Sequence, residues 1–156
     1  MSLILKIAFT RMPYTEAVMY ETYRISSVLP SSVLHSTLTD VNFRGFDLPK
    51  DTIILPNLYQ VHHDEKYWGD PECFRPARFL NPDGSLNKDE RVIAFSVGKR
   101  SCIGDFFAHN EFFLFLTGLL QHFNIKSHPD YPLPGNYVKA GLVLAPQPYK
   151  VVLEKR

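Results

Sequence analysis

The chain has 156 residues and a mass of 18.0 kDa, which is the size of a single domain. Hydrophobic residues make up 45% and charged residues 21%, a composition that excludes disorder along the whole chain. The formal net charge of +1 provides no strong field for attracting nucleic acid, so we expect no nucleic-acid partner. Two cysteines are too few for a disulfide scaffold, and 12 prolines predict an irregular, loop-rich fold.

The first ten residues, MSLILKIAFT, form an apolar segment that Lys6 interrupts. No basic region precedes this segment and no small-residue cleavage site follows it, so it does not look like a signal peptide. It is also shorter than the roughly 18 apolar residues of a membrane-spanning helix. We therefore treat residues 1–10 as an atypical N-terminal segment and residues 11–156 as the domain proper.

A first helix is predicted over residues 13–28. Pro13 suits the first turn of a helix, and Pro30 closes the segment. Glu21 and Arg24 lie three residues apart and therefore face each other on one side of this helix. Surface ion pairs with this spacing are common and contribute little by themselves, so the pair alone predicts no function.

Strands and turns are expected after this helix. Residues 42–46 have the composition of a hairpin, and the β-branched residues 52–56 that of a strand ended by proline. A short helix fits residues 59–64. The sequence His62-His63-Asp64 within it suggests a metal site. However, the side chains of adjacent histidines diverge on a strand, and no further ligand is near in the sequence. We therefore expect a structural role for this segment.

The second half begins with residues 65–94, which carry five breaks at Pro, Gly or Asn-Pro and no sustained period. Irregular stretches of this length are usually functional or wrapped around something. Residues 104–123 predict a second long helix, whose segment FFLFL is apolar on every side, so we expect it to be buried on most sides. After a loop, residues 137–144 and 149–153 predict a closing hairpin.

Cys102 lies in the segment FSVGKRSCIG, residues 95–104, immediately before the second long helix. The positive end of that helix and the two basic residues in the segment would stabilise a thiolate. Gly98 and Gly104 would let the backbone turn tightly and approach the sulfur, which a Cβ atom would obstruct. This arrangement suits a metal ligand or a nucleophile.

Other interpretations of Cys102 are weaker. A lone cysteine is most often a buried structural residue, but the flanking glycines and basic residues argue against that here. A zinc site is disfavoured because no second Cys or His lies at ligand spacing, and we expect Cys73 to be inert. Spacing alone leaves a nucleophilic Cys/His pair open.

The pattern F-x-x-G-x-R-x-C-x-G in this segment resembles the haem-binding signature of the cytochrome P-450 superfamily, and every defined position matches. The resemblance implies that Cys102 is the axial ligand of the iron of haem b, with Arg100 paired to a haem propionate. It further implies that Phe95 packs beside the ring and shields the sulfur, while Gly98 and Gly104 shape the loop.

Two further motifs resemble the same family. Glu21 and Arg24 match its E-x-x-R motif, and residues 74–79, FRPARF, are similar to its P-E-R-F segment, with Ala77 in place of the Glu. The resemblance implies that Arg78 completes a buried charge triad with Glu21 and Arg24. Such a triad is costly to desolvate and is better interpreted as fixing geometry than as adding stability.

The animal microsomal branch of the family suggests three more assignments. A His at the place of His35 contacts a haem propionate there. The loop after the first helix and the tip of the last hairpin line the substrate pocket, and they correspond here to residues 28–34 and 140–143. Both segments are largely apolar, which fits a lipophilic substrate such as a steroid, terpenoid or fatty acid, although ordinary core packing explains them equally well.

The resemblance implies a mainly α fold with small β-sheets, of which residues 11–156 are the C-terminal portion of a cytochrome P-450 domain. It implies a haem-thiolate monooxygenase that acts on a lipophilic substrate with O2 and electrons from an NADPH–cytochrome reductase. The helix that delivers protons in the family is not matched, so we expect no catalytic residue within this chain. The parent protein is expected on the cytosolic face of the endoplasmic reticulum membrane, associated only through a missing N-terminal region.

We therefore expect a partial chain, whether a fragment, a truncated gene model or a shortened isoform. Two alternatives stay open at this point: a catalytically inactive haem-binding or regulatory fragment, and a structural remnant without a ligand. By itself such a chain is expected to expose a large apolar face from its two main helices.

Overall fold

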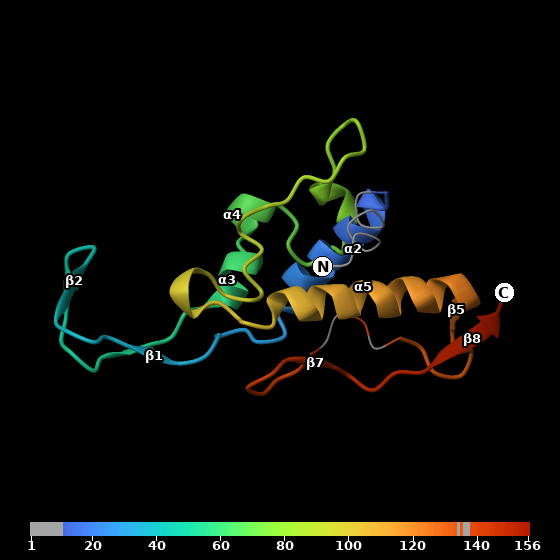
Figure 1. The fold of residues 1–156 in the computed structure, drawn as a ribbon. Helices are drawn as coiled ribbons and strands as arrows, with labels where there is room; N and C mark the ends of the chain where they lie inside the picture. The colour runs from blue at the N-terminus through green and yellow to red at the C-terminus, as the bar shows by residue number, and fades with distance from the viewer. Residues whose placement is uncertain (1–10, 134, 136–137) are drawn as a thin grey trace.

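The computed structural model describes residues 11–133, 135 and 138–156, so the N-terminal segment 1–10 lies outside the described residues. Figure 1 shows two long helices, α2 (Pro13–Ser26) and α5 (Asp105–His122), that lie against each other at the centre of the molecule. The strands of the described part form four separate two-stranded antiparallel sheets. The structure thus has few helices and small β-sheets, which is compatible with part of the mainly α fold expected from the sequence.

Helix α2 confirms the first predicted helix, but it ends two residues earlier than expected. Pro13 occupies the first turn, where its missing N–H costs no hydrogen bond. At the other end, Ser27 adopts a left-handed conformation with φ of 38°, and its hydroxyl donates to the Arg24 carbonyl at 2.9 Å. The side chain therefore satisfies a terminal carbonyl of the helix, and the chain turns away before Val28.

A hairpin forms where the sequence predicts one. Strands β2 (Val41–Phe43) and β3 (Phe46–Leu48) pair through the turn Arg44-Gly45, in which both residues have positive φ angles. Two consecutive positive φ angles give the turn the twist that a two-residue hairpin requires. The Asn42 side chain supports the turn by accepting the Gly45 N–H at 3.2 Å. This hairpin projects from one end of the molecule (Figure 1).

The other small elements before α5 flank this hairpin in the sequence. Strand β1 (His35–Ser36) pairs with β4 (Ile53–Ile54), which confirms the predicted strand over residues 52–56. The short helices are α3 (Leu58–His62), α4 (Glu65–Trp68), η1 (Pro76–Phe79) and η2 (Gly98–Arg100). Helix α3 confirms the predicted short helix, and the rest of the stretch up to residue 94 is largely irregular as expected.

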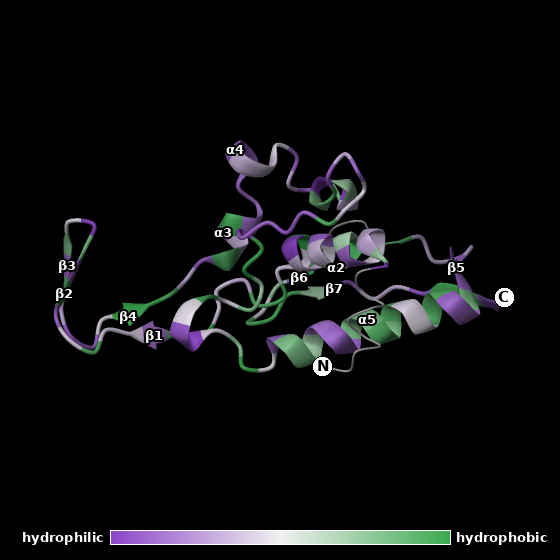
Figure 2. Cartoon of the chain, turned by 45° about the horizontal axis from the view of Figure 1, so that its top comes forward, coloured by the Kyte–Doolittle hydropathy of each residue, from purple (hydrophilic) through white to green (hydrophobic). Residues whose placement is uncertain are grey.

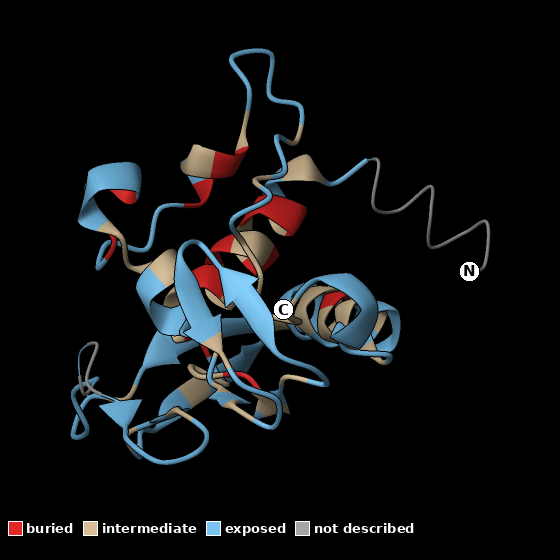
Figure 3. Ribbon diagram, turned by 90° about the vertical axis from the view of Figure 1, so that its left-hand side faces the viewer, coloured by how far each residue is buried: buried red, intermediate tan, exposed pale blue. Residues whose placement is uncertain are grey.

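The core gathers around α2. One cluster joins Met19 of α2 to Phe113 of α5, and a second joins Ala17 of α2 to Trp68 and Phe79. These five side chains are all less than 9% exposed. Figure 3 shows the buried positions at the centre, with exposed loops and strands around them. Because α2 contributes to both clusters, it holds the irregular stretch and α5 on one scaffold.

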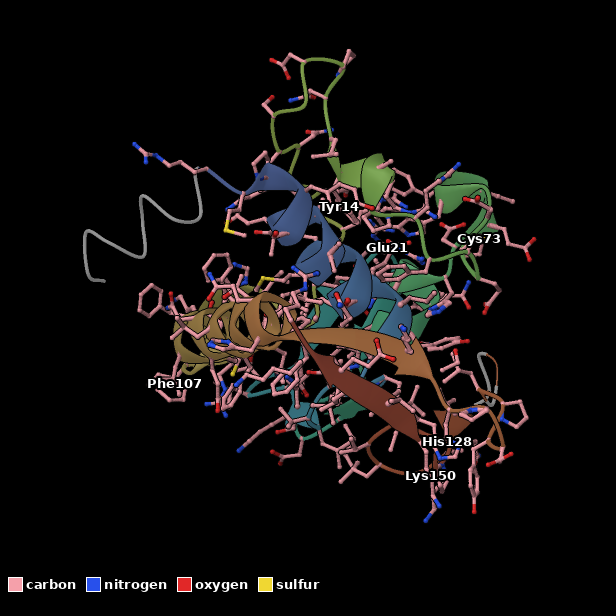
Figure 4. All side chains as sticks on the ribbon, turned by 90° about the vertical axis from the view of Figure 1, so that its right-hand side faces the viewer. Tyr14, Glu21, Cys73, Phe107, His128 and Lys150 are labelled. Atoms are coloured by element: carbon pink, nitrogen blue, oxygen red, sulfur yellow. The ribbon has the colours of Figure 1, made fainter. Side chains whose placement is uncertain are left out.

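Helix α5 contradicts the expectation that it would be buried on most sides. Phe113 is its one buried side chain, and several large apolar side chains of the helix and the residues before it are exposed: Ile103, Phe106, Phe107, Leu114 and Phe115. Figure 2 shows the apolar character along α5, and Figure 4 shows Phe107 far from Glu21 of α2. The cause is that α5 meets α2 along one side within the described part of the chain.

The exposed apolar face therefore belongs to α5, and the expectation that both long helices would contribute to it is wrong. Every residue of α2 except Tyr14 is buried or half-buried. No helix in the described residues has the length and apolar character needed to cross a membrane.

The prediction of a closing hairpin from residues 137–144 and 149–153 is also wrong, because these segments pair with other strands. The last four strands form two antiparallel pairs: β6 (Val138–Lys139) with β7 (Ala145–Pro146), and β5 (Phe123–Ser127) with β8 (Val151–Lys155). Pro146 and Pro148 cannot donate to a ladder, so β7 is short. Strand β8 instead pairs with the strand that follows α5, where Ile125 faces Leu153. Tyr137, the first residue of the predicted hairpin, lies outside the described residues.

Candidate functional site

The loop before α5 presents Cys102 at the surface. Ser96 and Gly98 both have positive φ angles, 62° and 77°, and bend the chain sharply on either side of Val97. The Cys102 N–H then donates to the Phe95 carbonyl at 2.9 Å, which closes the loop. Cys102 itself is exposed, and α5 begins at Asp105. The loop thus holds the cysteine by its backbone and leaves its sulfur free to meet a ligand.

The two glycines of the loop have different roles. Gly98 needs its positive φ of 77°, which side chains with a Cβ rarely adopt. Gly104 has φ of −96°, and a Cβ there would lie 3.9 Å from the Cys102 sulfur, an ordinary van der Waals distance. The expectation that a Cβ at position 104 would obstruct the sulfur is therefore not met by the loop as it stands.

Phe95 anchors the loop to α2. Its ring packs edge-on against Tyr23, with 5.2 Å between the ring centroids, and is half-buried. Tyr23 also contacts Phe112 of α5 at 5.5 Å, so one aromatic side chain joins the loop to both long helices. Burial raises the pKa of Tyr23 to about 12, so its hydroxyl stays neutral. The structure thus places Phe95 between the cysteine loop and the core.

His35 and Arg100 line the same cavity. The two residues are 65 positions apart in the sequence, so no local sequence pattern predicts that they share it. The cavity has a volume of about 420 Å³, and its remaining walls are largely apolar, formed by β1, β4 and the segment between them. The Nε2 atom of His35 is buried and makes no hydrogen bond within the described part of the chain. A buried nitrogen without a partner, on a residue that shares a cavity with an arginine, fits an anionic ligand such as a haem propionate.

Glu21, Arg24 and Arg78 form a buried ion-pair cluster. The Arg24 guanidinium donates to both carboxylate oxygens of Glu21, at 2.7 and 2.9 Å, and Arg78 donates to the Oε1 atom at 3.1 Å. The side chains are 0%, 0% and 7% exposed in the order Glu21, Arg24, Arg78. The Arg75 backbone N–H adds a further bond to Oε1 at 2.8 Å. The cluster forms with Ala77 in place of the family's Glu.

The same arginines fix the irregular stretch. Arg24 donates to the carbonyls of His62 and Pro71, both at 2.8 Å, and lies 5.3 Å from the centroid of the Trp68 ring. Arg78 donates to the Trp68 carbonyl at 3.2 Å and to Asp70 at 3.1 Å. Two buried guanidinium groups therefore act as hydrogen-bond donors to backbone carbonyls of the irregular stretch. These bonds explain how a loop-rich segment is held in one conformation.

His62 is a buried residue whose structural partners the sequence did not reveal. Its Nδ1 lies 2.8 Å from the Ser27 hydroxyl, and its Nε2 accepts the Ile93 N–H at 2.9 Å. Burial, with smaller contributions from the charges of His63 and Arg24, lowers the pKa of His62 to about 4. The available signal was its spacing from Leu58, because residues four apart share one face of a helix and both are buried.

The His63 side chain diverges from that of His62 as predicted, but the prediction assumed that the two residues lie on a strand. The two histidines lie at the end of helix α3 and not on a strand. The His63 ring stacks on Tyr59, with 3.9 Å between the ring centroids. The described residues also contain no group of three or more His, Cys, Asp or Glu side chains placed to hold a metal ion.

Of the two segments assigned to a substrate pocket, 28–34 is bonded to the residue that follows the other segment, 140–143, and not to that segment itself. The Leu144 N–H donates to the Val28 carbonyl at 2.8 Å, which joins the β6–β7 pair to the end of α2. A cavity of about 420 Å³ lies here, lined in part by Val28, Leu144 and Phe74. At the tip between β6 and β7, Leu142 is 81% exposed and faces solvent.

Comparison with known proteins identifies the family of this chain. The sequence profile of the family described as "Cytochrome P450" matches residues 7–153. The chain is 43% identical over 146 residues to "Farnesoate epoxidase" of Bombyx mori, covering 94% of this chain and 29% of that protein. It is 44% identical over 148 residues to "Cytochrome P450 2U1" of Bos taurus, covering 94% and 27%.

A third relative is "Cytochrome P450 1A1" of Felis catus, 49% identical over 113 residues, with 71% of this chain and 22% of that protein covered. The chain therefore spans less than a third of the length of each of these relatives. The profile match over nearly all residues, together with the relatives, shows the family that the sequence motifs resemble. The chain belongs to the cytochrome P450 family.

Proposed function

We propose that this chain is the thiolate-bearing, C-terminal portion of a haem-thiolate monooxygenase, with residues 11–156 as that portion. The observation that carries the proposal is the exposed Cys102, held by its own N–H on the Phe95 carbonyl just ahead of α5. A ligand to a metal must be fixed in place yet open on one side, and this loop meets both conditions. The family match over residues 7–153 supports the assignment.

The residues of this chain would hold haem b at three points. Cys102 would ligate the iron through its thiolate, while Arg100 and His35 would donate to the propionates from the cavity that they share. When bound, haem supplies the activation of O2 by which one oxygen atom enters a C–H bond of the substrate and the other becomes water. Phe95 would shield the sulfur from solvent, and Gly98 would hold the turn.

The remaining residues would act on the geometry of the site. Glu21, Arg24 and Arg78 would fix the irregular stretch that supports the cysteine loop, because their charges are paired and buried. We assign no proton-delivery group to this chain.

The proposed substrate is a lipophilic organic compound. The relative named farnesoate epoxidase supports a terpenoid acid or ester among the candidates. The cavity beside Val28 and Leu144 supports the same chemical class, because most of its lining residues are apolar, although His63 and Glu72 also line it. The proposed electron donor is an NADPH–cytochrome reductase, and the proposed location of the whole protein is the cytosolic face of the endoplasmic reticulum membrane.

The test is the absorption spectrum of the chain with added haem, reduced and exposed to carbon monoxide. We expect the displaced maximum that is typical of a thiolate ligand, and we expect Cys102→Ala to lose it. Cys73→Ala is the matched control, because Cys73 is also free and exposed but lies outside the loop. A spectrum that is the same in Cys102→Ala, or one that Cys73→Ala abolishes, would overturn the assignment.

A further inference from the structure

His62 connects parts of the chain that are far apart in sequence. Its carbonyl accepts from Arg24 of the buried cluster at 2.8 Å, so its backbone is tied to α2. Its ring contacts Ser27 at the end of α2 and the Ile93 N–H at the other side. The side chain is fully buried, with 0% exposed surface. His62 therefore lies between the helix that carries the cluster and the segment that leads to the cysteine loop.

The hydrogen bonds of the ring define its state. A backbone N–H can only donate, so the Nε2 atom that faces Ile93 must be an acceptor without a proton. The proton is then on Nδ1, which donates to the Ser27 hydroxyl, and that hydroxyl donates to the Arg24 carbonyl. Each polar atom has a partner in this neutral tautomer. Its low pKa agrees with a neutral ring at physiological pH.

Two further bonds lead from Ile93 to the cysteine. The Ile93 carbonyl accepts the Ser96 N–H at 2.8 Å, which closes a turn whose last residue has a φ of 62°. Within this turn, the Phe95 carbonyl accepts the Cys102 N–H at 2.9 Å. A shift of the Ile93 backbone would therefore move the carbonyl to which the cysteine is bound.

We infer that His62 is a positioning residue for Cys102: by accepting the Ile93 N–H, it fixes the turn that holds the cysteine backbone. The inference concerns the protein alone. Its consequence for iron ligation rests on the function proposed above, because only then does the position of the Cys102 sulfur affect a bound group. His62 touches neither the cysteine nor the cavity lined by His35 and Arg100, so its action is indirect.

Two substitutions separate the bonds of the ring. In His62→Gln the amide lies as far along the side chain as Nε2 and can accept from Ile93. In His62→Asn the amide lies at the distance of Nδ1, so it can donate to Ser27 and cannot reach Ile93. Both replace the aromatic ring by a smaller amide, but Asn is one methylene shorter than Gln and can keep the Ser27 bond. The difference between the variants at Cys102, set against their difference at an amide far from this turn, therefore reports on the Ile93 bond.

The measurement is amide hydrogen exchange, followed residue by residue in the chain without haem. We expect the Cys102 amide to exchange about tenfold faster in His62→Asn than in His62→Gln, the factor that one hydrogen bond is worth. The Leu153 amide in the β5–β8 sheet is the internal control and should not distinguish the variants. Equal exchange at Cys102 in the two variants, or an equal change at Leu153, would contradict the inference.

A measurement on the unmodified chain decides the matter if either variant fails to fold. In low denaturant, the amides of Ile93 and Cys102 should open with one common free energy, because one turn carries both. Separate opening free energies would overturn the inference. With haem added, a thiolate-type spectrum that survives His62→Gln and weakens in His62→Asn would extend the result to ligation. A missing spectrum in the unmodified chain would instead refute the proposed function and leave the exchange result standing.

Discussion

At the scale of single residues, the site depends on polar atoms whose partners come from distant parts of the chain. His35 has a buried nitrogen without a hydrogen bond inside the described residues, whereas every polar atom of the His62 ring is satisfied. The first arrangement is typical of a group that awaits a ligand, and the second of a group that holds structure. We therefore predict a ligand-binding role for His35 and a structural role for His62.

For His35, we predict a loss of haem affinity that depends on the propionates. His35→Leu removes the unpartnered ring nitrogen and should weaken haem binding by about tenfold or more, the worth of one hydrogen bond to a charged group. The measurement is haem titration of both proteins, repeated with the dimethyl ester of haem. The ester should bind the two proteins alike, because its esterified groups carry no charge. An equal loss for haem and its ester would show that His35 acts through packing.

For His62, we predict a loss of stability in acid. Its pKa falls from 6.5 to about 4 on folding, so below pH 6.5 the unfolded chain binds a proton that the folded chain excludes. Stability is therefore fully present above pH 6.5 and declines as pH falls toward 4, by about 3 kcal/mol in all. Urea unfolding at a series of pH values measures this slope.

The comparison for that slope is His62→Gln, which has no group that titrates in this range. Burial also lowers the pKa values of His63 and His109, so the unmodified chain has other contributions of the same sign. The difference between the two proteins isolates His62. If the two stability curves stay parallel between pH 6.5 and 4, His62 is not buried as a neutral ring.

At the scale of elements, local signals predicted what local interactions decide. Pro13 marks the start of α2, and the turn Arg44-Gly45 lies within the predicted hairpin. The pairing of β8 with β5 was not predictable in the same way, because Ile125 and Leu153 meet through tertiary structure alone. The burial of α5 was overestimated for a related reason: an apolar segment indicates what a helix can bury and not what is present to cover it.

The candidate site shows the same division. The motif around Cys102 could be identified from sequence because its residues are contiguous. Its support could not, since the partner of the His62 ring is Ile93, and His35 and Arg100 share a cavity through folding alone. Glu21 and Arg24 were predictable as neighbours on one helix face, whereas their burial depends on the carbonyls of the irregular stretch.

The buried cluster leads to a prediction about stability. Glu21→Gln removes the carboxylate that lies between the two arginines, so buried Arg24 loses its paired charge and Arg78 keeps only its pair with Asp70. Breaking a buried ion pair in this way costs about 3–5 kcal/mol, a large part of the stability of a small domain. We expect a chain that is largely unfolded by circular dichroism at 25 °C, or one with a greatly lowered midpoint in urea.

The matched control is Glu154→Gln, which breaks the exposed pair with Lys126 at 2.6 Å. Exposed pairs contribute about 0–1 kcal/mol, so this variant should unfold almost as the unmodified chain does. If both variants lose the same stability, burial is not what makes the Glu21 cluster important.

At the scale of the whole molecule, the chain has a well-enclosed centre on α2 and an open apolar side on α5. Phe107, Leu114 and Phe115 line one shallow cavity of about 360 Å³ on that side. Large exposed apolar patches are unusual in soluble monomers and favour association. The behaviour of the chain in solution is thus expected to be governed by α5, while its folded centre is governed by α2.

We predict that the chain binds a hydrophobic dye through this face. Phe107→Ser combined with Phe115→Ser should lower the dye fluorescence by about half and slow aggregation, because it removes two of the large exposed rings. Tyr149→Ser is the control, since Tyr149 is 55% exposed and lies outside α5. A monomeric chain that unfolds cooperatively and leaves the dye dark would contradict the prediction.

The contact between α2 and α5 also sets an order of events during synthesis. Tyr23 and His109, whose side chains approach to 3.4 Å, are separated by 86 positions. A ribosome adds about 5–20 residues per second, so the first helix waits roughly ten seconds for the second. Throughout this interval Met19 has no Phe113 to pack against. The core around Met19 therefore stays incomplete until α5 has been synthesised, an interval in which a chaperone would find its binding site.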